Sequence, residues 1–326
     1  MESLSLSTPV PLQPAPFGLS HRDDILMLGS CFADGMAQRL RDAAFVVESN
    51  PFGVLYNPIS LAQCLTRCAE GEEIGEENLT LQGGLWHSWL HHGSFSAPSK
   101  EACLGACNLA LGRAHQFLAR CNTLVVTFGT AFAYQLAEDG RVVGNCHKAP
   151  QRFFTKRLLG ANEIADAWRR ALSLASGLCR HPLRVILTVS PIRHWRDGAH
   201  GNALSKATLL LAAHQLEQIP CKDGTAAVTA SYFPSFEIMM DELRDYRFYA
   251  DDMLHPSSLA QRIIWERLKG TYMSEDTLAL TRLAERVATM RAHRPLFPGS
   301  EAYNEHLRRT DLLEEELRTA LAHARQ

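Results

Sequence analysis

The sequence lacks an excess of charge of either sign. Its 33 lysines and arginines nearly balance 35 aspartates and glutamates, so the formal net charge over 326 residues is −2 at pH 7. Such an even balance provides no electrostatic footprint for nucleic acid and no polybasic patch for a membrane surface. We therefore expect neither of these partners.

Long apolar runs and a paired cysteine framework are also missing. No segment approaches the ~20 apolar residues of a membrane-spanning helix. Residues 1–16 contain four prolines but neither the basic region nor the apolar stretch of a signal peptide. The nine cysteines are odd in number and scattered, which argues against a disulfide framework. These absences predict a reduced, cytoplasmic protein.

Cysteine and histidine spacings do not make a convincing metal site. The closest groups are Cys64 with Cys68, Cys103 with Cys107, and His87 with His91 and His92. No C-x-x-C pair occurs, and cysteines four apart on an apolar helix face are usually core residues. We expect no metal.

Short apolar runs rich in β-branched residues alternate with longer helical patterns. We predict strands at residues 25–28, 45–47, 124–128, 185–189 and 227–232. Continuous apolar runs are typical of strands covered on both faces. Helical patterns follow several of these runs, as at Phe32, Met36 and Leu40 and in the stretch after Asn57-Pro58. The alternation predicts an α/β domain with a mainly parallel, doubly wound sheet.

Two segments interrupt this alternation, and a third follows it. Residues 79–95 and 131–154 resemble hairpin insertions. From about residue 277 the strands stop, so we divide the chain into an α/β domain at 17–273 and a C-terminal helical extension at 274–326.

The helical extension carries two apolar stripes, which should not remain in water. They comprise Leu283, Val287 and Met290, followed by Leu312, Leu313, Leu317 and Leu321. We expect the stripes to dock on the α/β domain. A homodimer interface and a lid over the crevice are the alternatives.

Ser30 follows the first predicted strand and begins a helical pattern. In an open parallel sheet, ligands bind beyond the carboxyl ends of the strands. A serine there has its hydroxyl in the crevice and its N–H at a positive helix terminus, where an oxyanion is stabilised. By position alone, a simple helix cap is the better interpretation of Ser30.

Asp252 and His255 follow the last predicted strand, three residues apart in the segment D-D-M-L-H-P. On one turn, the carboxylate can orient the imidazole and stabilise its charged form, as in a catalytic triad. A lone D-x-x-H is weak evidence. Its combination with a serine after the first strand is much rarer.

These residues lie in a series of motifs that resembles the GSCFA family, a branch similar to the SGNH/GDSL hydrolases. The family's signature stands at residues 29–33, Gly-Ser-Cys-Phe-Ala. The likeness continues through segments 50–58, 128–131, 145–148, 190–194, 232–237 and 244–255. The resemblance covers residues 17–268 in order, and it shifts the interpretation of Ser30 from cap to nucleophile.

The resemblance implies a three-layer α/β/α sandwich with a five-stranded, flavodoxin-like sheet, and a serine esterase site that needs no cofactor. Ser30 would match the nucleophile, His255 the general base and Asp252 its orienting partner. The N–H of Gly53 would join that of Ser30 in the oxyanion hole. The sequence departs from the SGNH pattern at Thr130, where an asparagine donor is expected.

Several further residues are candidates for roles at the site. Either Thr130 or Asn145 could supply the missing oxyanion donor. Within the family-like segments, His147, Arg193 and His194 are candidate substrate-binding residues, although each has an ordinary structural interpretation. We expect Cys31 to pack under the sheet rather than to act as the nucleophile.

An aromatic group in the first insertion has two interpretations. Trp86, Trp89 and Phe95 could form a platform for a sugar or an acyl chain, but a satellite hydrophobic cluster is slightly favoured.

The sequence thus predicts a serine-dependent hydrolase that acts on a small-molecule or carbohydrate ester. An O-acyltransferase with the same triad and a catalytically silent binding module of the same fold are the alternatives.

Overall fold

The chain folds around a five-stranded parallel sheet with the order β10-β9-β5-β1-β2. The computed structural model describes residues 8–218 and 228–325. The strands are β1 (Asp24–Leu28), β2 (Val46–Ser49), β5 (Thr123–Phe128), β9 (Leu183–Val189) and β10 (Val228–Tyr232). All four neighbouring pairs are parallel, and the order is that of flavodoxin-like folds. The predicted sheet is confirmed.

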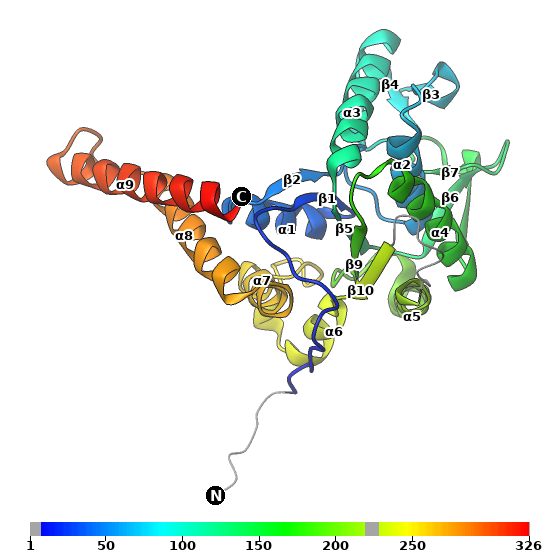
Figure 1. Cartoon of the computed structure of the whole chain (residues 1–326). Helices are drawn as coiled ribbons and strands as arrows, with labels where there is room; N and C mark the ends of the chain where they lie inside the picture. The colour runs from blue at the N-terminus through cyan, green and yellow to red at the C-terminus, as the bar shows by residue number, and fades with distance from the viewer. Residues whose placement is uncertain (1–7, 219–227, 326) are drawn as a thin grey trace, which may run out of the picture.

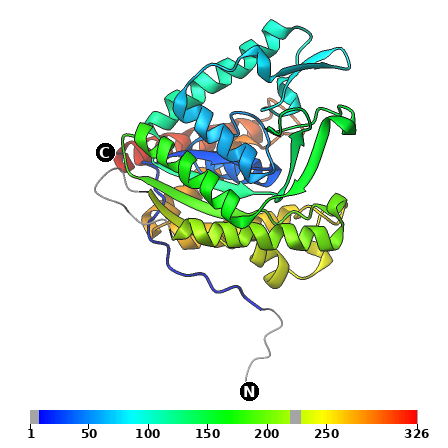
Figure 2. The same cartoon turned by 90° about the vertical axis from the view of Figure 1, so that its right-hand side faces the viewer.

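Helices cover both faces of this sheet, as Figures 1 and 2 show. The α-helices of the described residues are α1 (Cys31–Asp42), α2 (Pro58–Glu70), α3 (Lys100–Arg120), α4 (Ala161–Leu178), α5 (Gly198–Glu217), α6 (Ser235–Glu237), α7 (Ser258–Tyr272), α8 (Glu275–Arg291) and α9 (Glu301–Ala324). One buried cluster joins the sheet to α2, α3, α4 and α5, and a second joins it to α1 and α7. The α/β/α sandwich is therefore confirmed.

Local sequence explains where these elements begin and end. Asn57 caps α2, where its side chain accepts a hydrogen bond from the Ser60 N–H, and Pro58 occupies the first helical position. Gly71 ends the helix in the left-handed conformation, with φ of 71°. Two stretches named in the sequence analysis, residues 1–7 and Ala227, lie outside the described residues.

The two predicted insertions form small antiparallel sheets. The first is the hairpin of β3 (Leu79–Gln82) and β4 (Leu85–Ser88). The second is a three-stranded sheet of β6 (Phe132–Leu136), β7 (Val142–Val143) and β8 (Phe154–Leu158), with β6 at its centre.

The cysteine pairs are part of the interior. Cys64, Cys68, Cys103 and Cys107 are all buried in the cluster beneath α2 and α3. Across residues 8–218 and 228–325, no three histidine, cysteine, aspartate or glutamate side chains gather in a group that could hold a metal ion.

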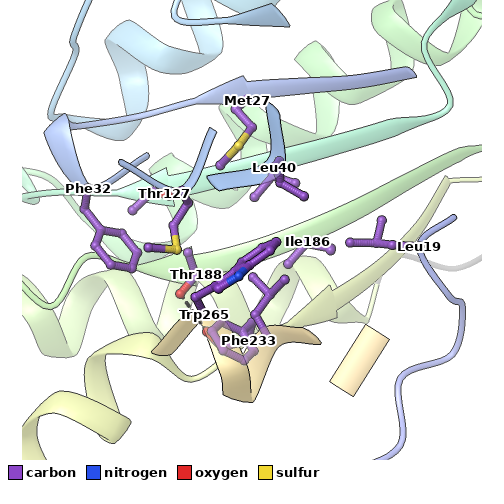
Figure 3. Close-up of a pocket in the computed structure, with 12 residues that line it drawn as sticks. Leu19, Met27, Phe32, Leu40, Thr127, Ile186, Thr188, Phe233 and Trp265 are labelled. Carbon is purple, nitrogen blue, oxygen red and sulfur yellow. Dashed lines mark hydrogen bonds between the residues drawn. The ribbon is translucent and has the colours of Figure 1, made fainter. Parts of the chain in front are cut away.

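A small void lies under α1, on the opposite side of the sheet from the insertions. It measures about 20 Å³ and is enclosed by apolar side chains, among them Phe32, Met27 and Trp265 (Figure 3). Its polar neighbour Thr188 already donates to the Phe233 carbonyl oxygen at 2.6 Å. A void of this size is at the limit for one water and cannot hold an acyl chain. It is a packing gap and not a ligand site.

The C-terminal extension folds back on the domain through α8. Leu280, Ala284 and Val287 of α8 are buried, so the buried stripe is rotated from the predicted one, and Leu283 and Met290 are only half-buried. Docking on the domain is also supported by Glu285, whose carboxylate accepts hydrogen bonds from Trp265 and Lys269 of α7.

Helix α9 packs on α8 and projects from the domain (Figure 1). It buries only Thr310, and Leu312 is 72% exposed. Its last turn meets the segment before β1, where the Arg22 guanidinium donates to the Ala324 carbonyl oxygen at 2.6 Å. This contact lies at the amino ends of the strands, so α9 is not a lid over their carboxyl ends. None of the described helices is long and apolar enough to cross a membrane.

This packing predicts unequal effects of two C-terminal deletions. Removing residues 275–326 should lower the free energy of unfolding by several kcal/mol, because each buried Leu or Val contributes about 1.5–3 kcal/mol. Removing only residues 301–326 should cost much less, because α9 buries one side chain. Urea unfolding measures both losses. Equal losses, or a change from dimer to monomer on sizing chromatography, would contradict docking within one chain.

Candidate active site

A cleft of about 540 Å³ opens at the carboxyl ends of the central strands. Ser30 follows β1, Thr130 follows β5, His194 follows β9 and His255 follows β10, and all four line this cleft. β1 and β5 are also the neighbours at which the chain reverses its direction of winding, the usual ligand position in such sheets. The topology therefore brings together residues that are far apart in the sequence.

The turn that carries Ser30 is fixed by polar contacts behind it. The Gly29 N–H donates to the Asn50 side-chain oxygen at 2.8 Å, and the Asn50 amide donates to Asp34 of α1 at 2.6 Å. Gly29 has φ of 154°, and a Cβ there would lie 2.8 Å from Thr127. Only glycine fits between the strand and the serine. Asn50 and Asp34 were not among the predicted site residues.

Ser30 is a helix cap and also a cleft residue. Its Oγ accepts a hydrogen bond from the Phe32 N–H at 3.3 Å, and the residue is only 1% exposed. Within residues 8–218 and 228–325, nothing accepts a hydrogen bond from the Ser30 N–H. A donor at the N-terminus of a twelve-residue helix is well placed to stabilise a negative oxygen. Capping and nucleophilic attack are therefore compatible roles for this residue.

Asp252 orients the imidazole of His255. Its Oδ2 lies 2.5 Å from His255 Nδ1, while its Oδ1 accepts hydrogen bonds from the Leu254 and His255 N–H groups. These backbone N–H groups, and then the ring, lower the pKa of Asp252 to about 2. Because the carboxylate is ionised and can only accept, Nδ1 donates to it. His255 Nε2 is then the nitrogen left for another partner.

Ser30 and His255 share the cleft without being joined. No hydrogen bond links Ser30 Oγ to His255 in the part of the chain that the structure describes. Catalytic hydrogen bonds are often long in the absence of substrate and tighten in the reacting complex. The histidine side chain is 47% exposed and stands on a loop, so a small movement is feasible.

Gly53 does not reach the cleft. Its N–H donates to the Asn50 carbonyl oxygen at 2.7 Å, and a Cβ on it would lie 2.4 Å from His92. The residue has φ of 74° in the tight turn after β2. In this arrangement Gly53 allows a close approach of two loops and has no free N–H to offer an oxyanion.

Thr130 lines the cleft, but its polar groups are engaged. Its N–H donates to the Tyr56 carbonyl oxygen at 3.1 Å. Its hydroxyl accepts from the Phe132 N–H and is paired with Ser205 of α5, both at 3.1 Å. Thr130 therefore has little capacity to replace the asparagine donor of the SGNH pattern.

Asn145 is the better placed of the two alternative donors. It lines the cleft, and its Oδ1 accepts a hydrogen bond from the His147 N–H at 2.8 Å. Because an N–H donates to this atom, it is the amide oxygen, and the Nδ2 group is the end of the side chain that remains free to donate. No acceptor holds this amide nitrogen among the residues described.

His147 lies outside the cleft. Its Nε2 donates to the Ser88 carbonyl oxygen at 2.7 Å, and its ring stacks on His87 with centroids 4.6 Å apart. Burial lowers its pKa to about 4, so the ring is neutral near pH 7. The residue has φ of 48°, and it fastens the second insertion to the first.

His194 and Arg193 both line the cleft, as expected. Burial, and then the nearby charge of Lys206, lower the pKa of His194 to about 4, so this ring is also neutral near pH 7. Its Nε2 atom is buried and has no partner within the described residues. The Arg193 guanidinium donates to the Met240 sulfur at 3.2 Å.

The prediction for Cys31 is wrong. We predicted that it packs under the sheet, but it is exposed and lines the cleft beside Ser30. Helix geometry explains the difference, because the apolar face of α1 begins at Phe32 and Ala33. Desolvation raises the pKa of the thiol, which favours the less nucleophilic protonated form.

The aromatic side chains of the cleft are not the predicted ones. Trp86 and Phe95 pack at the edge of the core, and Trp89 packs on Phe154, so this group is a satellite hydrophobic cluster. The exposed rings that line the cleft belong to Tyr56, Tyr134 and Trp195. Their sequence surroundings carry no distinctive aromatic spacing.

Lys206 of α5 supports the cleft from below. The side chain is fully buried, and its Nζ donates to the carbonyl oxygens of Gly129 and Ser190, both at 2.7 Å. Burial lowers its pKa to about 7. A signal in the sequence could have found it, because Lys206 lies on the same helical stripe as Leu209, Ala213 and Leu216.

Comparison with known proteins gives one match. No curated protein and no solved structure matches the chain. The sequence profile of the GSCFA family matches residues 24–268, from β1 to α7, which includes Ser30, Asp252 and His255. This match covers the sheet, both insertions and every residue that lines the cleft. The chain therefore belongs to the GSCFA family.

Proposed function

We propose that the chain is a serine-dependent ester hydrolase of SGNH type, with Ser30, His255 and Asp252 as its triad. One observation carries the proposal: a serine at a helix N-terminus and a carboxylate-oriented histidine line the same cleft. The resemblance to SGNH hydrolases, in which these positions match the triad, gives independent support.

In this mechanism Ser30 Oγ attacks the acyl carbon of the ester while His255 Nε2 takes its proton. The carbonyl oxygen gains the negative charge, which the Ser30 N–H and Asn145 Nδ2 stabilise. The ester C–O bond then breaks, and His255 returns the proton to the departing alcohol. A water molecule, activated by the same imidazole, cleaves the acyl-serine and restores the free hydroxyl.

The accessibility of the base favours hydrolysis over acyl transfer. The His255 side chain is about half exposed, and the cleft is open to solvent on that side. Water therefore reaches the imidazole without movement of a covering segment. An acyltransferase would need a drier site, so that an acceptor hydroxyl outcompetes water.

The first test concerns Ser30. Ser30→Ala should abolish labelling by a fluorophosphonate probe and lower turnover of a short-chain aryl ester about a thousandfold or more. It should also cost about 1 kcal/mol of stability, because Ser30 caps α1. Cys31→Ala is the matched control, since its side chain lines the same cleft, and it should keep both labelling and activity. A folded wild-type protein that is not labelled would support a silent binding module instead.

The second test separates two neighbouring aspartates. Asp252→Asn should lower kcat/KM by about a hundredfold to ten-thousandfold, because an amide cannot hold Nδ1 as a donor and stabilise the imidazolium. Asp251→Asn should remain within about twofold of wild type, because nothing in the described residues bonds to Asp251.

The pH profile gives a second readout of the same pair. Asp252 has a pKa of about 2 and stays ionised at all working pH values. Activity should nevertheless fall on acidification, because a protonated imidazole cannot accept the serine proton. Activity that does not fall at any acidic pH at which the protein remains folded would exclude a histidine base.

The third test compares the two candidate oxyanion donors. Asn145→Ala should lower kcat by about a hundredfold with little change in KM, because the donor acts on charge that develops in the transition state. Thr130→Val should affect kcat much less, because its hydroxyl is already bonded within the protein. Steady-state kinetics with one aryl ester measures both variants. The reverse order would assign the donor to Thr130.

A further inference from the structure

Two arginines on one wall of the cleft have no acidic partner. The segment after β9 carries Arg193 and Arg196, and both line the cleft. Throughout residues 8–218 and 228–325, no carboxylate lies within ion-pair distance of either guanidinium. The one hydrogen bond that the Arg193 guanidinium donates within the described residues goes to the Met240 sulfur, which is a weak acceptor. Most of the ten or so N–H donors of this pair therefore face solvent or a ligand.

The nearby carboxylates already have other partners within the protein. Asp197, at the end of the same segment, forms an ion pair with Lys156 on the facing strand β8. Asp252 is bonded to His255 and to two backbone N–H groups. Neither group is available to neutralise the arginines, so the cleft keeps an excess of positive charge beside the proposed nucleophile.

Exposed aromatic rings line the same cleft as the two arginines. Trp195 stands between the two arginines in sequence and is 54% exposed. Tyr56 and Tyr134 line other parts of the same cleft and are each 38% exposed. Single exposed rings are common on proteins, but several exposed rings that line one cleft are typical of a binding surface. A sugar ring has an apolar face that matches such rings and hydroxyls that carry O-acyl groups.

We propose that the cleft binds an O-acylated sugar that carries a negative charge, either a carboxylate or a phosphate. Arg193 and Arg196 hold the anion, because guanidinium groups match the oxygens of both anions in bidentate geometry. Trp195 and the two tyrosines hold the ring. The claim that the bound sugar carries an ester rests on the proposed hydrolase function. The claim that the cleft binds an anion does not depend on that function.

Binding of unesterified sugars tests the anion site without any turnover. The probes are D-glucuronate, D-glucose 6-phosphate and D-glucose, titrated into the wild-type protein by calorimetry at low salt. At least one of the two anions should bind about tenfold or more tightly than glucose. Comparison of the two anions identifies the carboxylate or the phosphate as the preferred group.

The double variant R193Q/R196Q should lose this preference and bind all three sugars equally. R113Q is the matched control, because Arg113 is an exposed arginine on α3 outside the cleft, and it should keep the preference. Equal binding of glucose and both anions to the wild type, or an equal loss in R113Q, would overturn the proposal. Anion preference in a protein whose Ser30 resists fluorophosphonate would support the anion site and contradict only the hydrolase function.

Discussion

The cleft depends on the buried amino group of one lysine. Lys206 reaches from α5 to the carbonyl oxygens of Gly129 and Ser190, which directly follow the adjacent strands β5 and β9. The next residues along these two loops are Thr130 and the segment that carries Arg193 and His194. Without this side chain, two buried carbonyl groups would lose their donors at a cost of about 1–3 kcal/mol each. The lysine therefore fixes the two loops relative to each other at the carboxyl ends of β5 and β9.

A comparable set of polar contacts, a second clamp, fixes the turn that carries Ser30. Asn50, in the turn after β2, holds the Gly29 N–H and is itself bonded to Asp34 in the first turn of α1. The serine is thus fixed from the strand before it, the loop beside it and the helix after it. Neither clamp touches the open part of the cleft. Both determine where groups that line the cleft stand.

The sequence predicted the sheet well because its strands are covered on both faces. The runs 124–128 and 185–189 are buried throughout and apolar except for one threonine each, and the parallel order follows from the helices between them. Ser30, Asp252 and His255 were located because they follow strand ends and match family motifs. The two clamps were not predicted, because the backbone groups that Asn50 and Lys206 bind become their neighbours only after folding. The place of Lys206 on an apolar helical stripe indicates its burial but not its partners. The sequence pattern also did not determine which side of a helix faces the core, and this explains the wrong predictions for Cys31 and for the buried stripe of α8.

The positions of Ser30 and His255 near the two ends of the α/β domain have a consequence for how the cleft forms during synthesis. Ser30 follows the first strand of the sheet along the chain and His255 follows the last, so Ser30 is synthesised well before His255. Parallel strands pair only after long loops close, so such sheets form late and cooperatively. A nascent chain that stops at the end of β10 contains Ser30 but not His255. The side chains that line the cleft are therefore brought together only in the completely synthesised and folded domain, and an incomplete chain cannot form this cleft.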